Sequence, residues 1–147
     1  MTTTLLALTL PARSGSIRAA RAAVEQAVRP LVATERMYDD IRLCLSEAAT
    51  NVVRHAYEPG SDGQSFDVEV EVDADELTIA VRDLGRGISR RSDADEPGGY
   101  GLSIIESLAS RLRIASASGH GTEISMVFLL ARRPLRGHGG AGAAVAD

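Results

Sequence analysis

Three polar residues, Glu47, Asn51 and His55, recur at steps of four along one segment of the chain. On a helix, each step of four advances only about 40° around the axis, so these side chains share one stripe. The amide oxygen of Asn51 is a hard ligand suited to Mg²⁺, and the carboxylate of Glu47 can act as a base toward a hydroxyl near a metal-bound phosphate. Taken alone, the spacing also fits a solvated helix face, and His55 fits a core or helix-end histidine better than a ligand.

A second motif, D-L-G-R-G-I at residues 83–88, follows an alternating apolar run that predicts a strand. A carboxylate at the exit of a strand, here Asp83, can accept a hydrogen bond from an adenine amino group. Gly85 and Gly87 let the backbone approach a flat base closely or turn sharply. A plain turn after a strand is the alternative.

Two further glycine motifs follow. The run G-G-Y-G-L at residues 98–102 leads into a predicted helix, and the free N–H groups of such a segment suit phosphate oxygens. A loop with a helix cap is the alternative here. The run G-H-G-T at residues 119–122 joins two predicted strands as a hairpin turn, and it places Thr122 where it can reach a base from the pocket floor.

The periodicity of apolar residues predicts the elements that carry these motifs. It follows steps of three and four in two long segments and steps of two from Phe66 onward. The predicted elements are a strand at 4–10, a helix from Ser14 or Ser16 to about 33, a helix capped by Thr34 and running to about 57, strands at 66–72 and 77–81, a helix at 101–110, and strands at 112–116 and 123–130. This order predicts an α+β fold, a two-layer sandwich with helices on one face of a mixed, mostly antiparallel sheet.

The length of 147 residues fits a single domain, expected over residues 1–131, followed by a disordered Gly/Ala-rich tail at 132–147. All 16 basic residues are arginine, which excludes a P-loop lysine, the strand lysine of ordinary protein kinases and Schiff-base chemistry. The net charge of −4 and the scattered arginines argue against nucleic-acid binding. No apolar run has the length of a membrane span, no signal peptide is recognisable, and the single Cys44 fits core packing, so a cytoplasmic location is expected.

The residues of these motifs also resemble those of a known family. The runs E-A-A-T-N-V-V-R-H-A, D-L-G-R-G-I, G-G-Y-G-L-S-I-I and G-T-E-I stand in the order of the GHKL (Bergerat-fold) ATPase superfamily. Within it, the chain most resembles the anti-sigma factor serine/threonine kinases of the RsbW/SpoIIAB type. The resemblance covers about residues 3–130.

This resemblance implies ATP and Mg²⁺ as cofactors and gives the first two motifs their roles. Asn51 would coordinate Mg²⁺ and Glu47 would be the catalytic base. Asp83 would bind adenine, with Gly85 and Gly87 shaping that wall of the site.

It also gives roles to the remaining motifs. Thr122 would assist at the base. Gly99 and Gly101 would cradle the phosphates within a motif that also includes Tyr100 and Leu102, beside a short acidic lid at 88–99. Tyr100 departs from the small or basic residue expected there. Arg54, close after Asn51 on the same helix, either reaches a phosphate or is simply exposed.

The implied function is a serine/threonine protein kinase that binds a sigma factor and phosphorylates a STAS-domain anti-sigma factor antagonist. A homodimer is expected, with Arg18 and Arg21 as candidate partner contacts. The alternative is a nucleotide-binding partner switch that sequesters a regulator without turnover. The catalytic domain of a histidine kinase is a further alternative, and it would need a separate chain to carry the phospho-accepting histidine.

Overall fold

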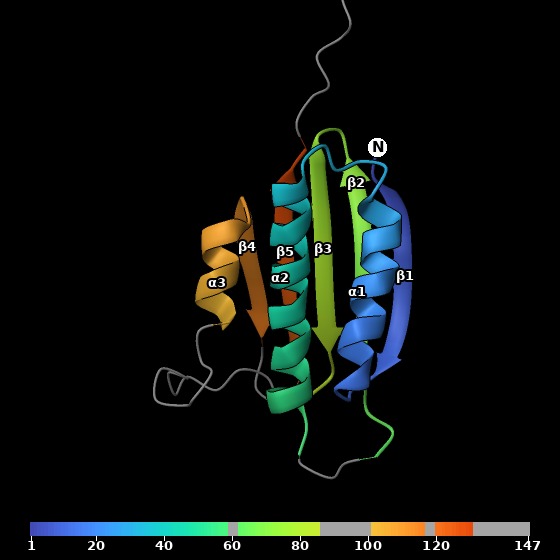
Figure 1. Ribbon diagram of the computed structural model, residues 1–147. Helices are drawn as coiled ribbons and strands as arrows, with labels where there is room; N and C mark the ends of the chain where they lie inside the picture. The colour runs from blue at the N-terminus through green and yellow to red at the C-terminus, as the bar shows by residue number, and fades with distance from the viewer. Residues whose placement is uncertain (59–61, 86–100, 117–119, 131–147) are drawn as a thin grey trace, which may run out of the picture.

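The protein is built of two layers, a five-stranded sheet and a layer of helices packed on one of its faces (Figure 1). The computed structural model describes residues 1–58, 62–85, 101–116 and 120–130. The elements are β1 Thr3–Pro11, α1 Gly15–Val28, α2 Glu35–Asn51, the π-helical segment η1 Val52–Ala56, β2 Ser65–Asp73, β3 Glu76–Asp83, α3 Gly101–Leu108, β4 Arg111–Ser116 and β5 Thr122–Leu129. The predicted α+β architecture is confirmed. The predicted lid, Gly87, Gly99, Tyr100 and the tail lie outside the described residues.

The strands are arranged in the order β1-β2-β3-β5-β4, and every pair of neighbours is antiparallel, so the described sheet contains no parallel pair. β5 lies between β3 and β4 and runs antiparallel to both. Because side chains alternate along a strand, Phe66, Val68 and Val70 of β2 face the helices and are buried, while Asp67 is exposed on the other face.

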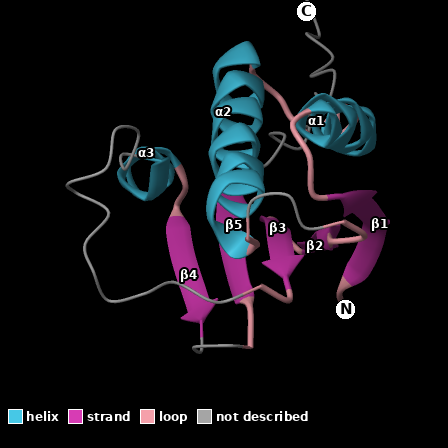
Figure 2. Ribbon diagram, turned by 90° about the horizontal axis from the view of Figure 1, so that it is seen from below, coloured by secondary structure: helices cyan, strands magenta, loops and turns pink. Residues whose placement is uncertain are grey.

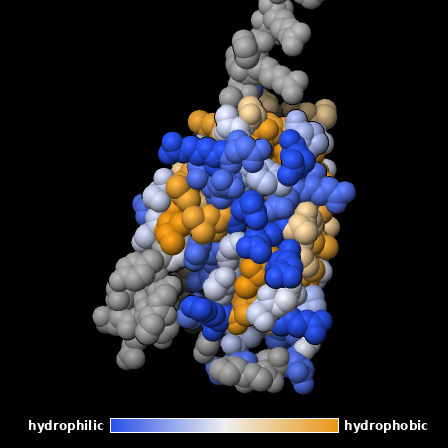
Figure 3. All heavy atoms as spheres, viewed as in Figure 1, coloured by the Kyte–Doolittle hydropathy of each residue, from blue (hydrophilic) through white to orange (hydrophobic). Residues whose placement is uncertain are grey.

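Each helix covers a different part of the sheet. Seen along the strands, α1 covers the side of β1 and β2, α2 lies over the centre, and α3 lies beside β4 (Figure 2). Their buried side is almost entirely aliphatic. α2 contributes Ile41, Leu45 and Ala48 to the core, and Val52 of η1 continues this stripe. Over the helix side of the molecule, hydrophilic side chains predominate and apolar ones gather over α3 (Figure 3).

Cys44 belongs to this core and is fully buried. Burial in apolar surroundings raises the pKa of its thiol to about 11, so the sulfur stays protonated at neutral pH. The structure therefore agrees with a packing role for this residue. In the described part of the chain, no helix combines the length and the apolar character needed to cross a membrane.

The helix ends follow local chemistry. Thr34 is in an extended conformation, and its Oγ1 accepts a hydrogen bond from the Met37 N–H at 3.2 Å, as expected for the predicted cap. α1 ends at Val28 instead of the predicted residue 33. Pro30 has no N–H to donate to a helical carbonyl, so the hydrogen-bond ladder stops there, although Arg29 before it keeps an αR conformation. The second helix keeps its predicted length only by widening into η1 after Asn51.

These packing relations bring four chain segments to one end of the molecule, the lower end in Figure 1. They are the C-terminal end of α2, the end of β3, the start of α3 and the start of β5. This end carries all four motifs singled out in the sequence, as far as the structure describes them.

Candidate nucleotide-binding site

The C-terminal end of α2 contributes Glu47 and Asn51. Both side chains are half-buried, whereas Ala48 and Val52 on the adjacent stripe are buried against the sheet. The helix thus has the packed side and the polar side that its spacing predicted. Arg54, in the π-helical turn that follows, is exposed.

Glu47 meets the start of α3. A β-carbon built on Gly101 would lie 2.8 Å from Glu47 Oε2, so glycine is needed for the carboxylate to sit this close to the first residue of the helix. The backbone N–H groups of a first helical turn have no partner within the helix and favour negative charge. Leu102, the next residue, is only partly exposed and packs against the core. Two of the predicted motifs are thereby brought into contact.

Asp83, the last residue of β3, is only 6% exposed. Its Oδ1 accepts a hydrogen bond from the Gly85 N–H at 2.9 Å, and the Thr122 backbone N–H also donates to this carboxylate. Burial raises the pKa of Asp83, and the two N–H donors oppose that rise. No described residue forms an ion pair with it. Among the described residues, this buried acceptor is therefore compensated by N–H dipoles and not by a cation.

Two glycines allow the chain to cross itself beside Asp83. A β-carbon on Gly85 would collide with the backbone carbonyl of Ala56. Gly121 has a φ of +85°, and a β-carbon there would collide with the backbone carbonyl of Asp83. Gly85 was singled out in the sequence, while the need for Gly121 follows only from the neighbouring strand.

Thr122 lies directly opposite Asp83 across the β3–β5 pair and is also 6% exposed. Its Oγ1 is 3.2 Å from Ser116 Oγ, which in turn donates to the Gly121 carbonyl at 3.4 Å. We call Asp83, Ser116 and Thr122 the inner cluster. The sequence predicted Asp83 and Thr122 but missed Ser116, because the alternation of β4 gives it no distinguishing signal.

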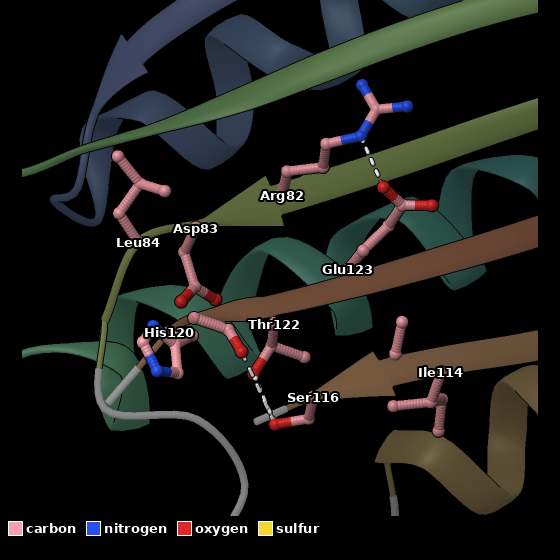
Figure 4. A pocket seen from close by; sticks show the side chains of 10 residues that line it. Arg82, Asp83, Leu84, Ile114, Ser116, His120, Thr122 and Glu123 are labelled. Carbon is pink, nitrogen blue, oxygen red and sulfur yellow. Dashed lines mark hydrogen bonds and ion pairs between the residues drawn. The ribbon is translucent and has the colours of Figure 1, made fainter. Parts of the chain in front are cut away.

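An open pocket of about 590 Å³ lies around this end of the sheet (Figure 4). Besides the inner cluster it is lined by Leu84, Ile114 and His120, and by Arg82 and Glu123. The last two are also a cross-strand pair, but they project on the face of the sheet away from the helices, where Arg82 forms ion pairs with Glu123 and with Glu69. We call Glu69, Arg82 and Glu123 the outer cluster.

The residues present fit a magnesium nucleotide. A buried carboxylate with no cationic partner among the described residues suits an exocyclic amino group, and the helix start beside Gly101 suits an anion. In the described part of the chain, no cluster of three or more His, Cys, Asp or Glu could hold a metal ion by itself. Mg²⁺ suits such a place, since it needs only one or two protein oxygens, such as the amide oxygen of Asn51, and completes its shell with phosphate and water.

The family description "histidine kinase-like ATPase domain" matches residues 10–128. The anti-sigma F factor of Pasteuria penetrans is 36% identical over 118 residues, which span 74% of this chain and 79% of that protein. The anti-sigma F factor of Clostridium beijerinckii is 34% identical over 115 residues, 71% of this chain and 80% of its own length.

Among solved structures, the RsbU and RsbW domains of a Mycobacterium tuberculosis protein match 87% of this chain with a TM-score of 0.67 and 25% identity. The match spans 33% of that longer chain. The histidine kinase domain of a blue-light activated histidine kinase from Erythrobacter litoralis has the same fold, with a TM-score of 0.52 and 21% identity.

The fold, the glycine-bounded site and these likenesses define a protein of the histidine kinase-like, or GHKL, ATPase class. Within that class, the chain belongs to the anti-sigma factor family of the RsbW/SpoIIAB type.

Proposed function

We propose that this protein is an ATP-dependent serine/threonine kinase that acts as an anti-sigma factor. The observation that carries the proposal is the convergence of three elements at one end of the molecule. They bring Glu47 and Asn51 of α2, Asp83 at the end of β3 and Gly101 at the start of α3 to this end. Phosphoryl transfer from ATP requires a metal ligand, groups that bind the phosphates and a general base, and binding of ATP also needs an acceptor for the adenine amino group.

Each residue has a defined task in this proposal. Asp83 accepts the adenine amino group, and Thr122 supports it from the adjacent strand. Asn51 is the protein ligand of Mg²⁺, and the backbone N–H groups at the start of α3 bind phosphate oxygens. Bound Mg²⁺–ATP supplies the transferable phosphoryl group, while Gly87, Gly99 and Tyr100, outside the described residues, complete the site as the resemblance implies.

Glu47 is the proposed general base. It is half-buried beside Gly101, so its carboxylate can be reached by a hydroxyl approaching along the polar side of α2. By accepting the proton of a serine or threonine hydroxyl, it would increase the nucleophilicity of that oxygen toward the phosphoryl group. This task separates a kinase from a nucleotide-binding switch, which needs no base.

The proposed partners are a sigma factor and a STAS-domain antagonist whose serine or threonine receives the phosphate. The proposal rests on the anti-sigma F factors to which the chain is similar. A cytoplasmic homodimer remains part of it, with exposed Arg18 and half-buried Arg21 of α1 as candidate contacts.

The test is phosphate transfer from Mg²⁺–ATP to a STAS-domain antagonist from the same genome, followed by mass spectrometry. E47Q should slow transfer by about 10²- to 10⁴-fold while leaving ATP binding in place, because a general base contributes on that order. N51A should weaken Mg²⁺–ATP binding itself. The matched control is E35Q, which makes the same chemical change at the opposite, exposed end of α2.

If the unchanged protein binds ATP and the antagonist but transfers no phosphate, the kinase assignment is wrong. The nucleotide-binding partner switch then replaces it. If E47Q and the unchanged protein transfer phosphate at the same rate, Glu47 is not the base.

A further inference from the structure

Tyr57 connects three segments of the chain at the edge of the candidate site. Its hydroxyl donates to the Ser65 carbonyl at 2.6 Å, at the start of β2, and accepts a hydrogen bond from the Leu84 N–H at 3.1 Å. Tyr57 itself follows directly on η1, the continuation of the helix that carries Glu47 and Asn51. One phenolic oxygen therefore joins the end of that helix to the turn after β3.

A second, independent contact holds the same two segments together. The backbone at Gly85 passes so close to the carbonyl of Ala56 that no β-carbon fits between them. The turn after Asp83 therefore contacts Ala56, the last π-helical residue, directly. The hydrogen bond between Leu84 and Tyr57 is adjacent to this contact in both segments.

Side-chain packing does little to hold this turn in place. Leu84 is 86% exposed, so its apolar side chain does not anchor the turn in the core. The described contacts of Leu84 and Gly85 are made by their backbone, through the hydrogen bond from the Leu84 N–H to the Tyr57 hydroxyl and the close approach of Gly85 to the Ala56 carbonyl. The orientation of Asp83 depends on the turn as well, because the Gly85 N–H donates to its Oδ1.

We infer that Tyr57 is a positioning residue that fixes the Asp83–Gly85 turn against the end of the α2–η1 helix and thereby sets the base-recognition half of the site. This inference rests on the proposed function, since it assigns Asp83 to the base. Tyr57 does not touch the nucleotide in this scheme. It acts through the Leu84 N–H, and the ring keeps its packing against the core when only the hydroxyl is removed.

The test compares Y57F with Y38F in the full-length protein. Both variants lose one phenolic oxygen. The Tyr38 hydroxyl accepts from Arg29 at 3.3 Å, on the first turn of α2 and far from the Asp83 end. Calorimetric and NMR titrations would use three probes, Mg²⁺–ATP, adenosine, and Mg²⁺–tripolyphosphate, which has no base.

Y57F should weaken the binding of ATP and of adenosine by about three- to tenfold, the usual worth of one hydrogen bond. Tripolyphosphate binding should stay unchanged, and Y38F should bind all three probes as the unchanged protein does. In nucleotide-free Y57F, the Leu84 amide should also exchange its hydrogen faster, because its acceptor has been removed.

Unchanged ATP and adenosine binding in Y57F would overturn the inference. So would equal weakening of all three probes, or the same losses in Y38F, since both would indicate a general loss of stability. If the unchanged protein binds neither ATP nor adenosine, the proposed function itself fails. This outcome differs from the one that overturns only the inference, in which the unchanged protein and Y57F bind ATP equally well.

Discussion

The inner and outer clusters both draw on β3 and β5, to which β4 adds Ser116 on the inner side and β2 adds Glu69 on the outer side, but the two clusters compensate charge in opposite ways. The outer cluster of Glu69, Arg82 and Glu123 lies on the uncovered face, where each acid is matched by the guanidinium. The hydrogen bond with Glu123 is the main contribution that raises the pKa of Arg82, although partial burial opposes it. The two carboxylates and one guanidinium leave this cluster with a single net negative charge, and its side chains are partly exposed.

The inner cluster differs by one step along each strand. Asp83 follows Arg82 and Thr122 precedes Glu123, so the alternation of side chains turns them toward the helices. There a carboxylate is buried with two N–H donors and no cation among the described residues. A buried acceptor without a counter-charge is unfavourable for folding. Its presence beside an open pocket indicates a site arranged for a ligand rather than for stability.

The substitution D83N tests this contrast most strongly. It should lower ATP affinity by about ten- to hundredfold, because a hydrogen bond to a charged acceptor is lost. The unfolding midpoint should change little. The amide oxygen still accepts from the Gly85 N–H, and removal of the buried charge offsets the weaker interaction with the Thr122 N–H. Calorimetric titration and thermal unfolding measure the two effects. A variant that binds ATP normally would remove Asp83 from the site.

The substitution G121A tests how closely the strands must cross beside Asp83. It should reduce the free energy of unfolding by about 1–3 kcal/mol, through positive-φ strain and a collision with the Asp83 carbonyl, and also weaken ATP binding. G63A is the matched control, because Gly63 has a φ of +73° but no neighbour within 4 Å among the described residues. It should cost about 1 kcal/mol by strain alone. Equal losses in both variants, measured by denaturant unfolding, would show that the collision is unimportant.

The raised pKa of Asp83 predicts opposite pH trends for stability and binding. In the folded protein this carboxyl holds its proton at a higher pH than the usual 3.8, so its contribution to stability is fully present below the unfolded value and is lost as pH rises through the folded value. Binding to an amino group needs the ionised form, so ATP affinity should fall as pH drops through the folded pKa, by up to about tenfold per pH unit. Titrations at several pH values measure this fall. The ATP affinity of D83N should not show this fall with pH. An equal fall in D83N would mean that another group causes it.

The substitution E123Q should have the smallest effect. It removes one partly exposed ion pair of the outer cluster, and such pairs contribute about 0–1 kcal/mol. ATP affinity should stay within about twofold of the unchanged protein, because Glu123 points away from the inner cluster (Figure 4). Parallel titration with D83N makes the comparison direct. A loss as large as that of D83N would mean that both faces serve the ligand.

Much of the fold could be predicted from the sequence, because apolar periodicity is a local signal. It gave the element order, the Thr34 cap and the packed stripe of α2. It failed where a local rule was overlooked, as at Pro30, which ends α1 early. The change to a π-helical turn after Asn51 has no signal in the apolar spacing, which continues through Val52 and Ala56.

The candidate site was predictable where its residues form motifs and not where they act across the chain. Glu47, Asn51, Asp83, Gly85, Gly101 and Thr122 were named from their spacing, and their roles stay predictions. Ser116 and Tyr57 were missed. Each is one hydroxyl at an ordinary position, and its importance comes from a partner in another element. For Ser116 this is Thr122 across the β4–β5 pair, and for Tyr57 it is Leu84 in the turn after β3.

The sequence by itself determined which side chains share a face and which chemistry they carry, because helical and strand periods are set by the local backbone. Only the tertiary structure decided which of those faces meet. It placed Glu47 against Gly101, set Asp83 opposite Thr122, and separated Asp83 from the charges of Arg82 and Glu123 one residue away. These contacts depend on how β5 returns between β3 and β4 and on how α2 packs over them, and no spacing within one segment encodes that arrangement.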